Sequence, residues 1–177
     1  MTCIVFLGCI VAGKSSMAKR LQAINYTPIV PGQLYREAYN QRTDFGIKAH
    51  SYWGGGGICP NEMTNELMRQ TIESGPKVNL VFDGYPRRVT QAQYLDSLIS
   101  VGLVVDLHIP DDVAVARLLR RQDNRPDDTE DIIRERLRVY HSNNQAIVDY
   151  YATGDRYKLI DADRPKDVVW DEVRSLI

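Results

Sequence analysis

Short apolar runs alternate along this chain with longer stretches in which apolar residues recur every three or four positions. Brief apolar runs bounded by turn formers are typical of buried strands, and the longer spacing is typical of amphipathic helices. Strands are predicted over residues 2–7, 27–30, 80–83, 104–109 and 157–160. Helices are predicted over residues 14–23, 33–42, 60–74, 90–100, 112–122, 129–152 and 166–176. This alternation predicts an α/β fold, with a parallel sheet covered by helices and ligands at the carboxyl ends of its strands.

Composition narrows the possible partners. The 177 residues suit one domain, and the formal net charge of −1 provides no overall field to attract nucleic acid or a membrane surface. No apolar stretch approaches the length of a membrane span. Cys3, Cys9 and Cys59 are odd in number and lack metal-ligand spacing, and no secretory-type start precedes the first strand. We therefore expect a cytoplasmic protein with no nucleic-acid or membrane partner.

The segment directly after the first strand has the spacing of a phosphate-binding loop. Residues 8–15 read Gly-Cys-Ile-Val-Ala-Gly-Lys-Ser and lead into the first predicted helix. Such a turn points backbone N–H groups and the positive end of a helix dipole at one anion. Lys14 adds a positive charge, and the Ser15 hydroxyl suits a magnesium ion or its water shell. The alternative is an ordinary glycine-rich turn after a strand.

Asp83 ends the third predicted strand, at the same edge of the sheet as the loop. A carboxylate in that place can hold a magnesium-bound water, as a Walker-B aspartate does. The alternative is a simple turn aspartate before Gly84.

Several segments resemble those of a known enzyme family. Asp83 to Arg87, followed by Gln91, resembles the DGFPR segment of adenylate kinases and related nucleoside monophosphate (NMP) kinases. Gly32 to Arg36 resembles the TGDxLR segment that helps to hold the monophosphate. The phosphate-binding loop also lies at the family's place in the chain.

Two further segments resemble the region of the family's lid. Arg117 to Arg121 resembles the RxxxR segment that precedes the lid. The RxDD and downstream arginine pattern of short-lid members is matched by Arg125, Asp127, Asp128 and Arg136. Together the resemblances cover nearly the whole chain.

The resemblance implies a P-loop NTPase fold with a five-stranded parallel sheet, a helical NMP-binding insertion and a short lid. The expected core comprises residues 1–30, 60–121 and 129–177, the NMP-binding segment residues 31–59, and the lid residues 122–128. The implied activity is the magnesium-dependent, reversible transfer of a phosphoryl group from ATP to AMP, giving two ADP, by a monomer. Because residues 122–128 are few and include no cysteine, a lid without structural zinc is expected, which would exclude water from the site.

The resemblance also implies roles for individual residues. ATP-binding positions are Gly8, Ala12, Gly13, Lys14, Ser15, Ser16, Arg117 and Arg121. AMP-binding positions are Gly32, Arg36, Ile58, Cys59, Gly84, Arg87, Gln91, Arg125 and Arg136. The catalytic cations are Lys14, Arg87, Arg121, Arg125 and Arg136, and Ser15 and Asp83 would hold Mg²⁺ through water.

These roles agree with the chemistry of phosphoryl transfer. Two polyanions must be brought in line while charge on the moving group is neutralised, so cations must surround the site. Arg36 and Arg87 suit a bidentate clamp on the acceptor phosphate, and Arg117 and Arg121 share one helical face. No general base is needed, because the acceptor oxygen is already ionised. The amide of Gln91 matches the donor and acceptor edge of adenine.

The chain also departs from the family pattern. Ile10 and Val11 replace a Pro-Gly pair in the loop, which predicts an altered but functional loop. Pro31 and Gln33 replace a threonine and an aspartate beside the AMP site, which weakens the assignment of AMP more than that of kinase. A kinase for UMP, CMP or another monophosphate, and a weakly active nucleotide-binding regulatory protein, remain alternatives. The glycines at 54–57 are either a hinge or a plain loop.

Overall fold

The computed structural model of the chain describes residues 3–53, 57–76, 78–120 and 130–177. Its strands are β1 (Cys3–Leu7), β2 (Thr27–Ile29), β3 (Leu80–Asp83), β4 (Val101–His108) and β5 (Tyr157–Asp161). Its helices are α1 (Lys14–Gln22), α2 (Pro31–Asn40), α3 (Asp44–Trp53), α4 (Asn61–Ser74), α5 (Val89–Leu98), α6 (Asp111–Leu119), α7 (Glu130–Ala152) and α8 (Lys166–Arg174). None of these described helices combines the length and the apolar composition needed to cross a membrane.

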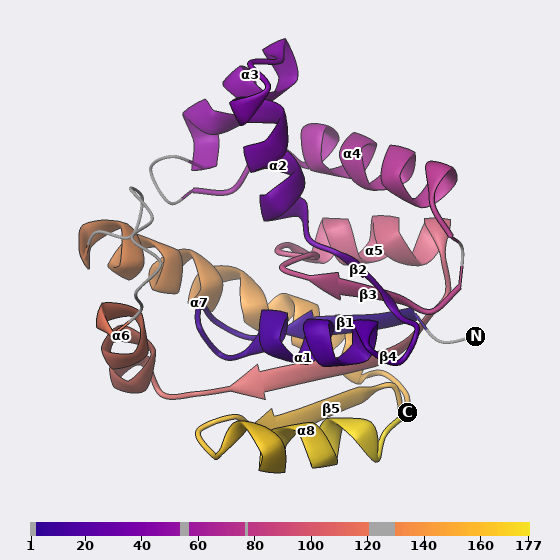
Figure 1. Cartoon of the computed structure of the whole chain (residues 1–177), viewed down its shortest axis with the longest axis vertical. Coiled ribbons are helices and arrows are strands. Elements are labelled where there is room, and N and C mark those ends of the chain that lie inside the picture. Colours follow the sequence, from indigo (N-terminus) through magenta and orange to yellow (C-terminus); the bar gives the residue numbers. More distant parts are fainter. Residues whose placement is uncertain (1–2, 54–56, 77, 121–129) are drawn as a thin grey trace.

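The strands form one parallel sheet in the order β2-β3-β1-β4-β5, which confirms the predicted α/β architecture. Strands β2 and β3 lie on one side of β1 in the sheet, and β4 and β5 lie on its other side, so the strand order reverses direction at β1. Such a reversal leaves a crevice at the carboxyl ends of the strands, where α/β proteins bind ligands. In Figure 1 the arrowheads of β4 and β5 point to the side on which α6 lies, and both chain termini lie on the opposite side.

Helices cover both faces of the sheet. Alternate residues of a strand point to opposite faces, so β1 contributes side chains to a core on each face. Ile4 and Phe6 of β1 pack in one core with residues of α1, α6, α8 and the first half of α7. Cys3, Val5 and Leu7 pack in a second core with residues of α4, α5 and the second half of α7. With both faces buried, β1 is apolar at every position.

Helices α2 and α3 form an arm that projects above the sheet in Figure 1. A small cluster of buried side chains holds it together, formed by Tyr35, Ala49 and Cys59. The two helices touch through their backbones at Gly46, where a Cβ would lie 2.2 Å from the carbonyl carbon of Ala38. Only glycine allows this approach.

Helix α3 is the one element of the structure that the hydrophobic pattern did not predict. Gly46 interrupts its helical signal, and Phe45, Ala49 and Trp53 pack in the small cluster inside the arm instead of in the main core. A start signal was nevertheless present, because the Thr43 hydroxyl accepts a hydrogen bond from the Gly46 N–H and so caps the helix. Strand β4 also begins earlier than predicted, because Val101 and Leu103 pair with β1 around a register irregularity.

Candidate active site

The loop between β1 and α1 curves around one point at the carboxyl edge of the sheet. Gly8 and Gly13 have φ values of 130° and 104°, and Val11 has a φ of 57°. Glycine adopts such values readily, whereas a β-branched residue is strained there. Where the family has the glycine of a Pro-Gly pair, this chain therefore has Val11 in a left-handed and strained backbone conformation.

Lys14 folds back over this loop from the first turn of α1. Its Nζ donates hydrogen bonds to the carbonyl oxygens of Gly8 and Cys9, at 2.7 and 2.6 Å. Desolvation lowers the pKa of Lys14, and the Asp83 carboxylate opposes that shift. The Lys14 ammonium group is thus held at the loop, close enough to the Asp83 carboxylate for the two charges to interact.

Ser15 and Asp83 meet beside the loop. The Ser15 hydroxyl donates to Asp83 Oδ2 at 2.5 Å, although 67 residues separate them in the chain. Asp83 is buried at the end of β3, paired in register with Phe6 of β1. A hydroxyl and a carboxylate are both oxygen ligands, and Mg²⁺ uses few of these from a protein while keeping waters. The pair fits a magnesium ion that arrives with a nucleotide. Among the described residues, no cluster of three or more His, Cys, Asp or Glu side chains forms a separate metal site.

Arg87 lies near the same carboxylate. The residue is exposed to solvent. The largest effect on its pKa is desolvation of the charged group by the surrounding protein, which lowers it. The positive charge of Arg136 lowers this pKa further, and the Asp83 carboxylate opposes both effects. Arg87 in turn lowers the pKa of Lys14. Lys14 and Arg87 therefore lie within electrostatic range of Asp83 and of each other, and Arg136 of α7 lies within range of Arg87, so positive charge gathers here as an anion site requires.

The connection that carries Arg87 is shaped by its own hydrogen bonds. Arg87 Nε donates to the Gly84 carbonyl at 3.0 Å, and Gly84 has a φ of 83°. Gln91 Oε1 accepts from the Arg87 backbone N–H at 2.8 Å, and Gln91 Nε2 donates to Asn61 Oδ1 at 3.1 Å. Gln91 is fully buried. Its amide is engaged at both ends here, so reading an adenine edge would require it to exchange these partners, and that role stays a prediction.

The other acceptor-side residues lie on or next to the arm. Arg36 donates to the Gly32 carbonyl at 3.0 Å, and its guanidinium lies 5.9 Å from the centre of the Trp53 ring. The Cys59 side chain is buried in the core of the arm, where its thiol donates weakly to the Ala49 carbonyl. Ile58, which precedes it, is half-buried. Their contact with a base stays a prediction.

The two family departures at the start of α2 have simple local roles. Pro31 is the first residue of the helix, a position that suits its fixed φ. Gln33 is exposed and donates to Glu37 Oε1 at 2.9 Å. The amide of Gln33 thus bonds within its own helix.

Arg117 has a partner that the sequence did not reveal. Its guanidinium donates to the Ala162 carbonyl and to Asp163 Oδ1, both at 3.0 Å, so α6 is tied to the connection after β5. The sequence offered one indication of this partner: Asp163 follows the last predicted strand and so lies at the carboxyl edge of the sheet. Arg121, Arg125, the lid at 122–128 and the glycines at 54–56 lie outside the described residues.

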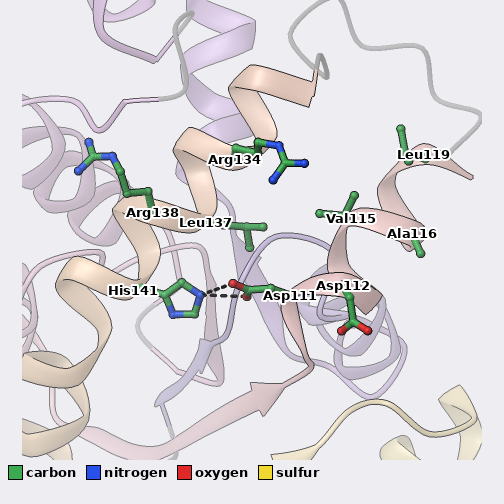
Figure 2. Close-up of a pocket in the computed structure, with 9 residues that line it drawn as sticks. All are labelled: Asp111, Asp112, Val115, Ala116, Leu119, Arg134, Leu137, Arg138 and His141. Carbon is green, nitrogen blue, oxygen red and sulfur yellow. Dashed lines mark hydrogen bonds and ion pairs between the residues drawn. The ribbon is translucent and has the colours of Figure 1, made fainter.

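A separate pocket of about 640 Å³ lies between α6 and α7 (Figure 2). Leu137 and Val115 project into it, and His141 Nε2 meets the Asp111 carboxylate at 2.9 Å at one end. No residue of the loop 8–15 lines this pocket, and neither does Arg117. It is not the site built around Lys14.

Gly8→Ala is expected to lower the free energy of unfolding by about 3 kcal/mol. The added Cβ would lie 2.5 Å from the Leu107 carbonyl oxygen, at a φ that alanine rarely adopts. Gly154→Ala is the matched control, because its φ of 101° is also positive but nothing lies within 4 Å of its Cβ. The control is expected to cost about 1 kcal/mol, from backbone strain alone. Urea unfolding measures both, and equal losses would show that the contact with Leu107 is not what demands glycine.

Comparison with known proteins shows the family of the chain. The family model for adenylate kinase matches residues 6–156. Adenylate kinase 1 from Nostoc sp. is 36% identical over 100% of this chain and 99% of its own length. Adenylate kinases from Synechococcus sp. and Pseudarthrobacter chlorophenolicus are each 32% identical, over 98% and 100% of this chain and 95% and 97% of their own lengths. The full-length match and the site at the carboxyl edge of the sheet lead to one conclusion: the chain belongs to the adenylate kinase family.

Proposed function

We propose that this chain catalyses the reversible transfer of the γ-phosphoryl group of ATP to AMP, giving two ADP. The observation that carries the proposal is the loop of phosphate-binding form, with Lys14 hydrogen-bonded to its Gly8 and Cys9 carbonyls and the Ser15–Asp83 hydrogen bond beside it. Arg87 lies within electrostatic range of Lys14 and Asp83, and Arg136 within range of Arg87. Family membership supports the same activity.

The donor phosphates bind at the loop in this proposal. Gly8, Ala12, Gly13, Ser15 and Ser16 hold them through the backbone of the loop, together with the dipole of α1. The N–H groups of Ala12 and Ser16, which donate to the Cys9 and Gly13 carbonyls in this structure, would exchange these partners for phosphate oxygens. Lys14 exchanges its two carbonyl partners for phosphate oxygens. Arg117, oriented by Asp163 and the Ala162 carbonyl, offers the flat face of its guanidinium to the adenine ring.

The acceptor binds between the arm and the β3–α5 connection. Arg36 and Arg87 hold its phosphate from two sides, and Arg136, with Arg121 and Arg125, neutralises the charge that develops on the moving group. Gly32, Ile58, Cys59, Gly84 and Gln91 form the rest of the acceptor pocket. No side chain has to remove a proton, because the attacking phosphate oxygen is already ionised at neutral pH.

Magnesium enters with ATP, and Ser15 and Asp83 would hold it through its water shell. When bound, it neutralises charge on the donor phosphates. The protein's part is to keep these two oxygens together at the loop, as their hydrogen bond at 2.5 Å does.

We propose that the chain is divided into the segments that this activity requires. Residues 31–59 form the NMP-binding segment and residues 122–128 a short lid without zinc, both carried by a core of residues 1–30, 60–121 and 129–177. We also propose a monomer that works in the cytoplasm. Three unpaired, buried cysteines suit a reducing compartment.

An acceptor panel tests the proposal. The purified chain is incubated with ATP, Mg²⁺ and AMP, UMP, CMP, GMP or dAMP in turn, and nucleoside diphosphates are quantified against a reaction without acceptor. AMP is expected to be the preferred acceptor. A preference for UMP or CMP would assign the chain to another monophosphate, and tight nucleotide binding by calorimetry without turnover would indicate a regulatory protein.

A further inference from the structure

A group of polar side chains joins the end of the arm to the connection that carries Arg87. Its centre is Asn61, the first residue of α4. Asn61 Oδ1 accepts hydrogen bonds from Arg88 and from Gln91 Nε2, both at 3.1 Å, and Asn61 Nδ2 donates to Thr90 Oγ1 at 2.8 Å. One side chain of α4 therefore bonds three side chains of residues 88–91.

Arg88 makes a second link between the same two segments. The nitrogen that bonds Asn61 also donates to the Cys59 carbonyl oxygen, at 3.2 Å. Cys59 lies where the chain leaves the arm, and its side chain packs with Tyr35 of α2. The guanidinium of Arg88 thus holds the backbone of this exit against the β3–α5 connection.

The link continues to the backbone of Arg87 itself. Gln91, bonded to Asn61 through its nitrogen, accepts the Arg87 N–H through its oxygen at 2.8 Å. Gln91 is 0% exposed, so water cannot replace a partner that is lost. An unbroken series of hydrogen bonds therefore runs from the exit of the arm to the residue that would hold the acceptor phosphate.

We propose that Asn61 and Arg88 are positioning residues for the acceptor site. They fix the exit of the arm relative to Arg87 and thereby set the distance between the two halves of the phosphate clamp. Neither residue needs to touch the substrate. The inference rests on the proposed function, because it concerns how the AMP side of that site is held in shape. Small displacements of a positioning group are costly in phosphoryl transfer, where alignment supplies much of the rate.

Two substitutions test the proposal by steady-state kinetics. Arg88→Met and Asn61→Leu each remove hydrogen bonds without adding a charge. Each is expected to raise KM for AMP about tenfold and to leave KM for ATP within about twofold, because the ATP side is built by other segments. Arg88→Lys keeps the charge but has a single donor nitrogen in place of the guanidinium fork, and is expected to recover part of the loss. The double variant is expected to cost less than the sum of the two, because both act through one network.

Arg69→Met is the matched control. Arg69 also lies at a helix surface and bonds two side chains, Glu66 and Glu73, but both are on its own helix α4. Its loss is expected to change neither KM. If Arg88→Met and Asn61→Leu fold and leave KM for AMP unchanged, or raise both KM values equally, the positioning role is wrong.

A second measurement does not depend on turnover. Hydrogen exchange of residues 57–66, followed without nucleotide, is expected to quicken about tenfold in Arg88→Met and to stay unchanged in Arg69→Met. If exchange quickens in Arg88→Met but the wild-type chain does not use AMP, the structural link between the arm and residue 87 stands and the proposed function is wrong. Unchanged exchange together with an unchanged KM, in a chain that does use AMP, would reject the link alone.

Discussion

Lys14→Met is expected to lower kcat/KM for the transfer from ATP to AMP by about 10³-fold, because it removes a preorganised positive charge from the phosphates. The shape of the loop should survive. Methionine matches the length of the lysine stem, and relief of a desolvated charge offsets the two lost hydrogen bonds to Gly8 and Cys9. The free energy of unfolding is therefore expected to change by less than about 1 kcal/mol.

The comparison uses Lys19→Met, which removes an exposed lysine of the same helix. Initial rates with both nucleotides varied, together with urea unfolding, measure the effects. Retention of more than about a tenth of the wild-type kcat/KM in Lys14→Met would mean that this lysine does not neutralise the transferring group.

Arg87→Ala is expected to reduce kcat/KM for AMP by about 10²- to 10³-fold, as the loss of one preorganised charged donor does elsewhere. Arg87→Lys should recover little of this. A lysine presents a point charge, whereas the guanidinium can offer two parallel N–H groups to one phosphate. The backbone N–H of residue 87 still reaches Gln91 in both variants, so the connection should keep its course.

Arg138→Ala is the control for charge alone, because Arg138 is a 69% exposed arginine of α7 that pairs with Glu135. It is expected to change kcat/KM for AMP by less than about twofold. Product formation by the Arg87 variants across AMP concentrations separates the effect on KM from that on kcat. A lysine variant as active as the wild type would exclude a bidentate clamp.

Local motifs carried most of what the sequence predicted about the site. The loop around Lys14 and the strand-end Asp83 each sit within a few residues of the apolar run that positions them. The parallel sheet then places strand ends at one edge, so their meeting follows from topology. Arg87 was predicted from the resemblance of a five-residue string that begins at the end of β3. Arg136 also required the resemblance, and less of the local pattern supported it, since it lies in the first half of a long helix with other arginines nearby.

Contacts between distant segments are what the sequence did not reveal. Arg117 and Asp163 are 46 residues apart, and Arg88 and Asn61 are 27 residues apart. No periodicity connects such pairs, because their meeting depends on how helices settle on the sheet. Gln91 shows the same limit: its type suggested a base reader, a role that stays a prediction, but nothing in the sequence indicated that it links α4 to the β3–α5 connection. Helix α3 was missed because it packs on another helix of the arm, through a glycine that weakens the helical pattern.

The close approach at Gly46 has a mechanical consequence. Two helices in backbone contact resist sliding or bending against each other, so α2 and α3 behave as one stiff lever. The arm joins the rest of the protein after β2, near Val30, and before α4, near Cys59. Arg88 bonds the second of these junctions through the Cys59 carbonyl, so any movement of the arm as one unit has to strain or break that hydrogen bond.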